Sequence, residues 1–180
     1  MRIMGIDPGS NYMGLGCVEL KGSSLTCIGH TVVHVSAGAE NWPQRLKAIF
    51  EAVNAHIEVW KPMAVSAEEV FFAKNPQSAL KLGQARGAAL AAVARLDIPI
   101  HEYSASTVKQ TLTGSGRAEK EQVERMVKLF LGASLAAHGP VARFDASDAL
   151  AIAICHAQQN KIQSLGKPQA QNIREKISRL

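Results

Sequence analysis

Two carboxylates in this chain come directly after segments that have the composition of strands. Asp7 ends an apolar run and precedes Pro8 and Gly9, a pair that favours a turn and stops strand pairing. Glu68 ends a second short apolar run, residues 63–67. An acid followed by Pro-Gly can also simply begin a hairpin, so Asp7 alone does not identify a site. Ligand sites in open α/β sheets form at the carboxyl ends of strands, however, and two acids at such ends favour contact with a metal or a substrate.

Two further carboxylates, Asp145 and Asp148, lie three residues apart at the expected start of a helix, so that both project from one face of its first turn. An acid at this position can cap the helix or complement its dipole, which would account for one of them. Two like charges on one face repel each other and need a cation nearby. The rest of this helix is apolar almost all round and must be buried, which would bring both acids to the sheet edge that carries Asp7 and Glu68.

Together the four carboxylates would form a cluster of oxygen ligands that either takes up protons or holds hard divalent cations. Oxygen ligands alone suit Mg²⁺ or Mn²⁺ rather than zinc. Two such metal ions would suit the attack of water on a phosphodiester, with one ion activating the nucleophile and the other stabilising the leaving oxygen. The chain has no Gly-rich loop ending in Lys-Ser or Lys-Thr, so a nucleotide is not the indicated substrate.

Three basic residues fit a polyanionic substrate. A Gly-containing connector, residues 113–117, is predicted to be flexible. It ends at Arg117 and lies between Lys109 and Lys120. The helix that follows it offers free backbone amides to anions. These cations favour a grip on a DNA backbone, although each could simply be solvated, and Arg117 most readily. Phe71 is predicted either to anchor the core or to stack on a base.

These residues require an α/β fold to position them. The apolar patterns predict strands at residues 1–7, 12–20, 24–35, 63–67 and 98–103, and helices at about 42–60, 76–96, 104–112, 118–131 and from 145 onward, with a loop at 132–142. The first three strands follow one another directly and predict an antiparallel meander. The last two are separated by a helix and predict parallel pairing. The expected architecture is a five-stranded mixed sheet flanked by helices.

One predicted helix, residues 76–96, carries small residues at four-residue intervals: Ala79, Gly83, Gly87 and Ala91. Glycine in a helix interior costs about 0.5 to 1 kcal/mol relative to alanine, so a close packing contact has to offset it. This small-residue stripe is predicted to be a packing surface, either between two copies of the chain or against the chain's own sheet, with neither favoured.

Composition sets the remaining expectations. The chain has 180 residues, 47% of them apolar, which suits one domain with a sizeable core. Its three cysteines are widely spaced, so neither a disulfide framework nor a zinc site is indicated. Without a signal peptide or membrane-spanning run in the sequence, we expect a cytoplasmic protein. The net charge of +5 lies mostly in residues 160–180, so residues 1–158 are predicted to form the domain and residues 159–180 a basic, flexible C-terminal tail.

Five segments of the chain resemble the motifs of the RuvC family, the bacterial Holliday-junction resolvases. They are residues 5–10 (GIDPGS), 68–75 (EEVFFAKN), 79–87 (ALKLGQARG), 108–110 (VKQ) and 145–153 (DASDALAIA). The resemblance covers about residues 1–157 in the family's order and spacing. It implies a ribonuclease-H-like fold, a homodimer, and two Mg²⁺ ions per active site with Mn²⁺ as a substitute. The implied function belongs to DNA recombination and repair: paired, symmetric nicks in opposed strands of a four-way DNA junction.

The same matching implies roles for individual residues. The acids Asp7, Glu68, Asp145 and Asp148 resemble the family's catalytic metal ligands, Lys109 and Lys120 resemble its DNA-backbone lysines, and Phe71 resembles the aromatic residue that contacts junction bases. The family also implies a branch-migration motor of the RuvA and RuvB type as partner, and a preference for short thymine-containing sequences. Glu69 departs from the family pattern, and because side chains alternate along a strand, only one of Glu68 and Glu69 is expected to point at the site.

Two other functions are compatible with parts of the sequence. Actin-like sugar kinases and ATPases resemble it in opening with a Gly-Ile-Asp-x-Gly hairpin, but they need further phosphate and adenosine loops and generally a longer chain. A non-catalytic, junction-binding scaffold is the second alternative. The complete set of four acids argues against it, because a polyanion would bind more readily without them.

Overall fold

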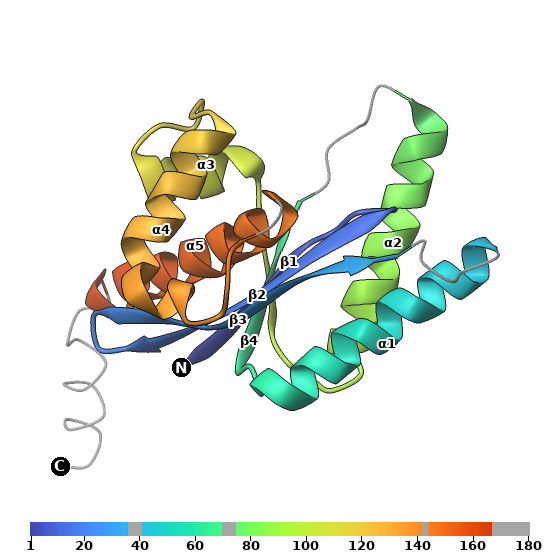
Figure 1. Ribbon diagram of the computed structural model, residues 1–180, viewed down its shortest axis with the longest axis horizontal. Helices are drawn as coiled ribbons and strands as arrows, with labels where there is room; N and C mark the ends of the chain where they lie inside the picture. Colours follow the sequence, from blue (N-terminus) through green and yellow to red (C-terminus); the bar gives the residue numbers. More distant parts are fainter. Residues whose placement is uncertain (36–40, 70–74, 142–143, 167–180) are drawn as a thin grey trace, which may run out of the picture.

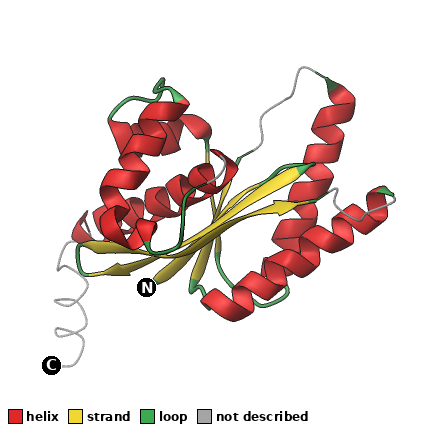
Figure 2. Ribbon diagram, in the orientation of Figure 1, coloured by secondary structure: helices red, strands yellow, loops and turns green. Residues whose placement is uncertain are grey.

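The computed structural model describes residues 1–35, 41–69, 75–141 and 144–166. Its elements, in chain order, are β1 (Arg2–Asp7), β2 (Tyr12–Lys21), β3 (Ser24–His34), α1 (Trp42–Trp60), β4 (Ala64–Glu68), α2 (Pro76–Ala94), β5 (Ile100–Tyr103), α3 (Ala105–Thr113), α4 (Lys120–Ala136) and α5 (Phe144–Gly166). Figure 1 shows the sheet lying between two groups of helices, and Figure 2 shows the same layers by secondary structure.

The five strands form one sheet in the order β3-β2-β1-β4-β5. The pairs β1–β2 and β2–β3 are antiparallel, whereas β1–β4 and β4–β5 are parallel. The short turns between the first strands permit direct hairpins, and each parallel pair needs a helical crossover, which α1 and α2 supply. The prediction of a mixed α/β sheet, with a meander followed by parallel strands, is confirmed.

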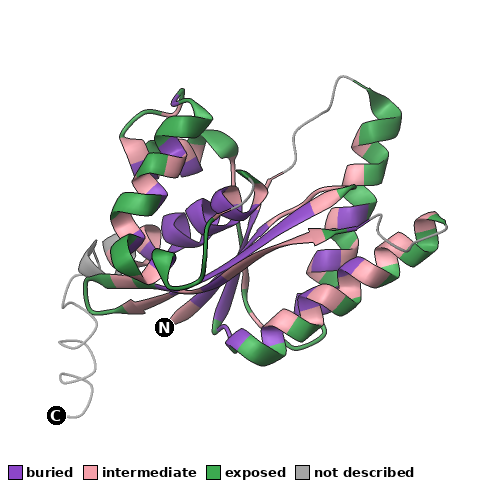
Figure 3. Cartoon of the chain, viewed as in Figure 1, coloured by how far each residue is buried: buried purple, intermediate pink, exposed green. Residues whose placement is uncertain are grey.

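Side chains that alternate along β1 divide the core into two layers. Met4 and Ile6 pack with α1 and α2, whereas Ile3 packs with α3, α4 and α5. By the same alternation Gly5 and Asp7 face the α5 side of the sheet. Figure 3 shows buried residues along the central strands and the inner faces of the helices, with exposed residues on the outer helix faces. The chain thus aims its first acid at the helix that carries Asp145 and Asp148.

The predicted helix boundaries follow from capping residues. Asn41 caps α1 by accepting a hydrogen bond from the Gln44 N–H, and Lys61 ends that helix in the left-handed conformation at φ 49°. Asn75 caps α2 in the same way, with Pro76 in the first turn, where its missing N–H is not needed. These starts agree with the sequence-based boundaries because the caps are encoded locally.

The predicted loop at residues 132–142 is partly wrong. Gly132 does leave helical geometry, at φ 49° and ψ −134°, but the chain then resumes a helical turn to Ala136. This extra turn is stabilised from outside, because the Ser134 hydroxyl accepts the Cys27 N–H of the edge strand β3 at 3.0 Å and Leu135 is buried. Tertiary packing therefore extends a helix that the glycine would otherwise end.

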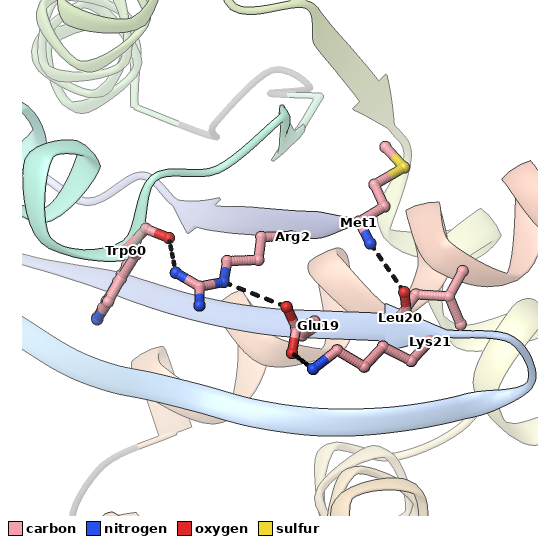
Figure 4. A network of polar contacts seen from close by, with 6 residues as sticks. All are labelled: Met1, Arg2, Glu19, Leu20, Lys21 and Trp60. Carbon is pink, nitrogen blue, oxygen red and sulfur yellow. Dashed lines mark hydrogen bonds and ion pairs between the residues drawn. The ribbon is translucent and has the colours of Figure 1, made fainter.

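The amino end of β1, opposite the end that carries Asp7, is fixed by the polar contacts drawn in Figure 4. The Met1 ammonium donates to the Leu20 carbonyl at 2.8 Å, and the Arg2 guanidinium donates to the Trp60 carbonyl at 2.9 Å. Glu19 accepts from Arg2 and pairs with Lys21 at 2.8 Å. These contacts tie β1 to β2 and to the end of α1, which holds the strand along its length.

The small-residue stripe of α2 does not pack on the chain's own sheet. Ala85, Ala89, Ala92 and Val93 make that contact instead, and they are buried. Gly83 and Gly87 are exposed, and a Cβ added to either would meet nothing within 4 Å. Of the two alternatives left open by the sequence, packing on the chain's own sheet does not occur, and Gly83 and Gly87 lie on an exposed surface of the described chain.

Two compositional expectations can also be compared with the structure. The three cysteines, Cys17, Cys27 and Cys155, are unpaired and buried, as small apolar residues are. No helix in the part of the chain that the structure describes is long and apolar enough to span a bilayer. Helix α5 continues to Gly166, beyond the end of the predicted apolar pattern at residue 158.

Candidate active site

Helix α5 approaches the sheet closely because three glycines lie beneath it. A Cβ on Gly5 would lie 1.9 Å from the Ala149 carbonyl oxygen, and one on Gly14 would lie 1.9 Å from the Asp145 carbonyl oxygen. Gly16 lies opposite Gly5 in the β1–β2 pair, and its Cβ would meet the Leu150 side chain. Any side chain at these positions would lift the helix, so the glycines set the distance between α5 and β1.

The parallel pairing of β1 and β4 brings Asp7 and Glu68 to the same end of the sheet. The last paired residues are Ile6 and Ala67, each one residue before its acid. Ser66, two residues before Glu68, faces α5, because its hydroxyl donates to the Ile152 carbonyl at 3.2 Å. Glu68 therefore shares that face, by the period-two alternation of strands.

The three elements enclose a pocket of about 240 Å³ at the carboxyl ends of β1 and β4. Asp7, Glu68 and Asp148 line it together with Lys109 and Lys120. Its remaining wall is apolar and consists of Ala105, Val108, Val123, Ala151 and Ile152. Of the four acids predicted to converge, three line this pocket, and the two lysines predicted to bind DNA line it as well.

Lys120 forms an ion pair with one of the acids. Its ammonium group donates to Asp148 Oδ2 at 3.0 Å, with the two side chains 63% and 24% exposed. The hydrogen bond to Asp148 raises the pKa of Lys120 above its ordinary value, so the ammonium group stays charged at neutral pH. The lysine is exposed enough to move, and the carboxylate that it contacts faces the pocket.

Burial and neighbouring charges shift the protonation of both strand-end acids. Desolvation is the main cause that raises the pKa of Asp7 to about 8, and the charges of Asp148, Glu68 and Asp145 raise it further, while Lys120 lowers it. The pKa of Glu68 is also raised, first by burial and then by Asp148. The metal-free site therefore holds fewer negative charges at neutral pH than its composition suggests.

Asp145 and Glu69 lie outside the lining of this pocket. Asp145 is nevertheless near enough to Asp7 for its charge to raise the pKa of that carboxyl, and its backbone rests on Gly14. Glu69 follows the end of β4, and its N–H donates to the Tyr103 carbonyl at 2.9 Å. Of the adjacent pair, only Glu68 lines the pocket, as strand alternation predicts.

The connector predicted to be flexible is held by side chains. The Gln110 amide donates to the Gly114 carbonyl at 2.8 Å and accepts the Gly116 N–H at 2.9 Å. The Thr113 hydroxyl donates to the Lys109 carbonyl and accepts the Ser115 N–H at 3.1 Å. These hydrogen bonds give the connector a defined path between α3 and α4. Arg117, at its end, is exposed and does not line the pocket, and Phe71 lies outside the described residues.

The chemistry of the side chains in the pocket fits a hard divalent cation. Carboxylate oxygens are the ligands that Mg²⁺ prefers, and burial together with the neighbouring acids raises the pKa of Asp7 and of Glu68, so a bound cation would favour their ionised forms. Lys120 already provides one cation at Asp148. Within the described ranges, no three His, Cys, Asp or Glu side chains are gathered as a ready metal-binding group.

Sequence reasoning missed the parts of the site that act through packing. Gly5 and Asp7 are two residues apart and therefore share a face of β1, as Gly14 and Gly16 do on β2. That spacing was a usable signal of close helix approach. The two hydrogen bonds that the Gln110 side chain makes with the connector could not be predicted from sequence, because they depend on the path of the chain after α3.

A comparison with protein families finds one model, described as crossover junction endodeoxyribonuclease RuvC, that matches residues 3–156. Among curated relatives, the crossover junction endodeoxyribonuclease RuvC of Citrifermentans bemidjiense is 46% identical over 167 residues, which cover 93% of this chain and 98% of that protein.

Solved structures are similar as well. Thermus thermophilus RuvC in complex with Holliday junction substrate aligns with a TM-score of 0.80 at 35% identity, covering 91% of this chain and 96% of that one. The yeast mitochondrial Holliday junction resolvase aligns with a TM-score of 0.63 at 15% identity, covering 91% and 83%, which shows a shared fold. The ribonuclease-H-like fold expected from the resemblance is thus confirmed. The match over nearly the whole described core, together with the acids at the ends of β1 and β4, shows that the chain belongs to the RuvC family of crossover junction endodeoxyribonucleases.

Proposed function

We propose that this chain resolves Holliday junctions by metal-dependent hydrolysis of phosphodiesters in opposed DNA strands. The observation that carries the proposal is the pocket that joins Asp7, Glu68 and Asp148 with two lysines in a chain of the RuvC family. A relative at 35% identity has been solved in complex with Holliday junction substrate, which supports the same substrate for this chain.

The four acids Asp7, Glu68, Asp145 and Asp148 are proposed to hold Mg²⁺, with Mn²⁺ as a substitute. Two ions per site would activate a water molecule and stabilise the leaving oxygen. Asp7 is the acid most affected by cation binding, because its raised pKa means that it must release a proton to become a ligand. The Lys120–Asp148 pair would have to open for Asp148 to bind a cation, and the exposure of Lys120 permits this.

Lys109 and Lys120 are proposed to contact the phosphates that flank the cleaved bond. Both line the pocket, so a phosphate drawn towards the acids meets positive charge on the α3 and α4 side. The held connector between these helices fixes the spacing of the two lysines. Arg117 is proposed as a weaker, peripheral phosphate contact because it is exposed and remote from the lining. Phe71 is proposed to stack on a junction base, by analogy with the family.

Cleavage of a synthetic four-way junction tests the function directly. With Mg²⁺, wild type should nick the junction in opposed strands and leave linear duplex intact. With chelator it should cut neither substrate. Asp7→Asn and Glu68→Gln should bind the junction but fail to cut it. Glu69→Gln is the matched control, because its acid is adjacent in sequence but does not line the pocket, and it should cut like wild type.

The same experiment separates the alternatives. If wild type binds junctions without cutting them, the chain acts as a non-catalytic scaffold. If Asp7→Asn cuts as fast as wild type, the pocket is not the catalytic site. Equal cleavage of duplex and junction would contradict selectivity for branched DNA.

We also propose that the chain is a homodimer that pairs through α2. The exposed stripe of Gly83, Gly87 and Ala91 would let a second helix approach closely, which would offset the cost of two glycines within a helix. A Gly83→Leu variant should remain folded, since the added side chain meets open space, but sediment as a monomer. A dimer of unchanged affinity would exclude this surface.

The remaining expectations rest on family membership and sequence. The chain is proposed to act in the cytoplasm during recombination and repair, alongside a branch-migration motor of the RuvA and RuvB type. Residues 159–180 are proposed to supply weak, salt-sensitive contacts to DNA through their basic side chains. Removing residues 167–180 should weaken junction binding at low salt while leaving the nuclease domain folded.

A further inference from the structure

Arg86 makes two contacts, one with the chain at Glu68 and one with the edge strand β5. It lies on α2, outside the pocket, with its side chain 20% exposed. Its Nε donates to the backbone carbonyl of Glu68 at 3.2 Å. Its Nη2 lies 2.8 Å from Glu102 Oε1 on β5. One guanidinium therefore joins α2, the end of β4 and the edge strand β5.

The end of β4 has few other restraints on the side that faces β1. Ladder pairing between the two strands stops at Ile6 and Ala67. Pro8, which follows Asp7, has no N–H with which β1 could extend the ladder. On the other side, the Glu69 N–H bonds to the Tyr103 carbonyl. The peptide that carries Glu68 is thus held by β5 on one side and by Arg86 through its carbonyl.

The position of this peptide sets the direction of the Glu68 side chain. The backbone of Glu68 sets the position and direction of its Cα–Cβ bond, so a fixed peptide leaves only the side-chain torsions to place the carboxylate oxygens. A restraint on its carbonyl therefore acts on the catalytic candidate without touching the substrate.

The charge balance at Arg86 argues against a direct role in DNA binding. Glu102 neutralises the guanidinium at 2.8 Å, and the side chain is mostly buried. The planar fork of arginine suits two simultaneous acceptors, whereas a phosphate-binding cation needs free donors in solvent. Lys109 and Lys120, by contrast, line the pocket beside the acids.

We infer that Arg86 is a positioning residue for Glu68: its bond to the Glu68 carbonyl, oriented by Glu102, fixes the carboxyl end of β4 for metal binding. This inference rests on the proposed function and adds a residue to it. Groups that orient metal ligands from outside the coordination shell typically change activity or metal affinity about 10-fold to 100-fold when removed.

Single-turnover cleavage of a four-way junction by Arg86→Met tests this inference, with junction affinity measured in the same buffer. The rate at saturating protein should fall about 10-fold to 100-fold, and the Mg²⁺ concentration for half-maximal rate should rise, while junction affinity and its salt dependence stay unchanged. Arg95→Met is the control. This arginine lies at the end of the same helix but donates to Asn54 on α1 instead of contacting β4, so both the rate and the Mg²⁺ requirement should stay near those of wild type.

A second variant covers the case in which Arg86→Met does not fold. Arg86→Lys keeps a positive charge but lacks the fork that reaches both acceptors, so its rate should lie between those of wild type and Arg86→Met, with a raised Mg²⁺ requirement. A wild-type rate and Mg²⁺ requirement in a folded Arg86 variant would overturn the inference. Weaker junction binding with an unchanged saturated rate would also overturn it, since Arg86 would then contact DNA. Failure of wild type to cut junctions would instead contradict the proposed function.

Discussion

Replacing Asp7 with Asn should stabilise the metal-free protein at alkaline pH and remove its cleavage activity. The reason lies in the pocket, where burial and the charges of Asp148, Glu68 and Asp145 raise the pKa of Asp7 to about 8. The ionised carboxylate is therefore a cost to the fold that a bound cation would offset. Asparagine keeps nearly the same shape without the charge.

The sign and size follow from proton linkage. The pKa of this carboxyl is 3.8 in the unfolded chain and about 8 in the folded protein, so between these pH values the folded protein holds a proton that the unfolded chain has lost. The free energy of unfolding therefore falls as the pH rises from about 4 to about 8. At about 1.4 kcal/mol for each pKa unit, the upper limit is roughly 6 kcal/mol. Solvent and counterions reach the open pocket and screen part of this energy, so we expect a measured difference of about 2 kcal/mol.

The assay is urea denaturation of wild type and Asp7→Asn in chelator, at about pH 5 and about pH 9. The free energy of unfolding of the variant should exceed that of wild type by more at the higher pH. Added Mg²⁺ should then raise the stability of wild type, by about 2.7 kcal/mol at one hundred times its dissociation constant, and raise that of the variant much less.

Glu69→Gln provides the matched control, because this acid adjoins Glu68 without lining the pocket. It should show neither the pH-dependent gain nor a weakened response to Mg²⁺. The reasoning is refuted if Asp7→Asn differs from wild type equally at both pH values, because the effect would then not come from ionisation of Asp7. It is also refuted if Asp7→Asn retains the full stabilisation by Mg²⁺.

Three further substitutions probe other parts of the site. Lys120→Met removes a cation that lowers the pKa of Asp7, so the pH profile of cleavage should move to higher pH and junction affinity should become less salt-dependent; an unmoved profile would contradict the contact. Gly14→Ala would place a Cβ 1.9 Å from the Asp145 carbonyl oxygen, and we expect a loss of about 3 kcal/mol or more in urea denaturation, whereas a stability equal to wild type would mean that α5 can move freely. Gln110→Ala removes both bonds that hold the connector after α3, so junction affinity should fall about 5-fold, measured by fluorescence anisotropy, with little change in melting temperature; unchanged affinity would show that the connector does not present the lysines.

Local sequence was sufficient for most of the fold. Asn41 and Asn75 cap helices that begin where the sequence predicted, at residues 42 and 76, and the order of strands and helices predicted both the meander and the parallel pairs. Capping and short connections depend on a few neighbouring residues, which is why they can be read in order. The helical turn after Gly132 was not predicted, because it is stabilised by contacts of Ser134 with β3 and of Leu135 with the core.

Sequence also supplied the candidate acids. Asp7 and Glu68 follow apolar runs, so the sequence indicated that both lie at strand ends. Strand alternation implied that only one of Glu68 and Glu69 faces the site, and the resemblance to the RuvC motifs favoured Glu68. What alternation could not give was the separation of these acids from α5, since that distance depends on what lies between the helix and the sheet.

Tertiary structure alone decided how the acids meet and what charge they carry. Gly5 and Gly14 let α5 rest on the backbone of β1 and β2, which brings Asp148 into the pocket, and burial there raises the pKa of Asp7. Arg86 reaches the Glu68 carbonyl from a separate helix. Residue types and their order are local properties of the chain, whereas desolvation, charge coupling and backbone restraint arise only when distant segments pack together.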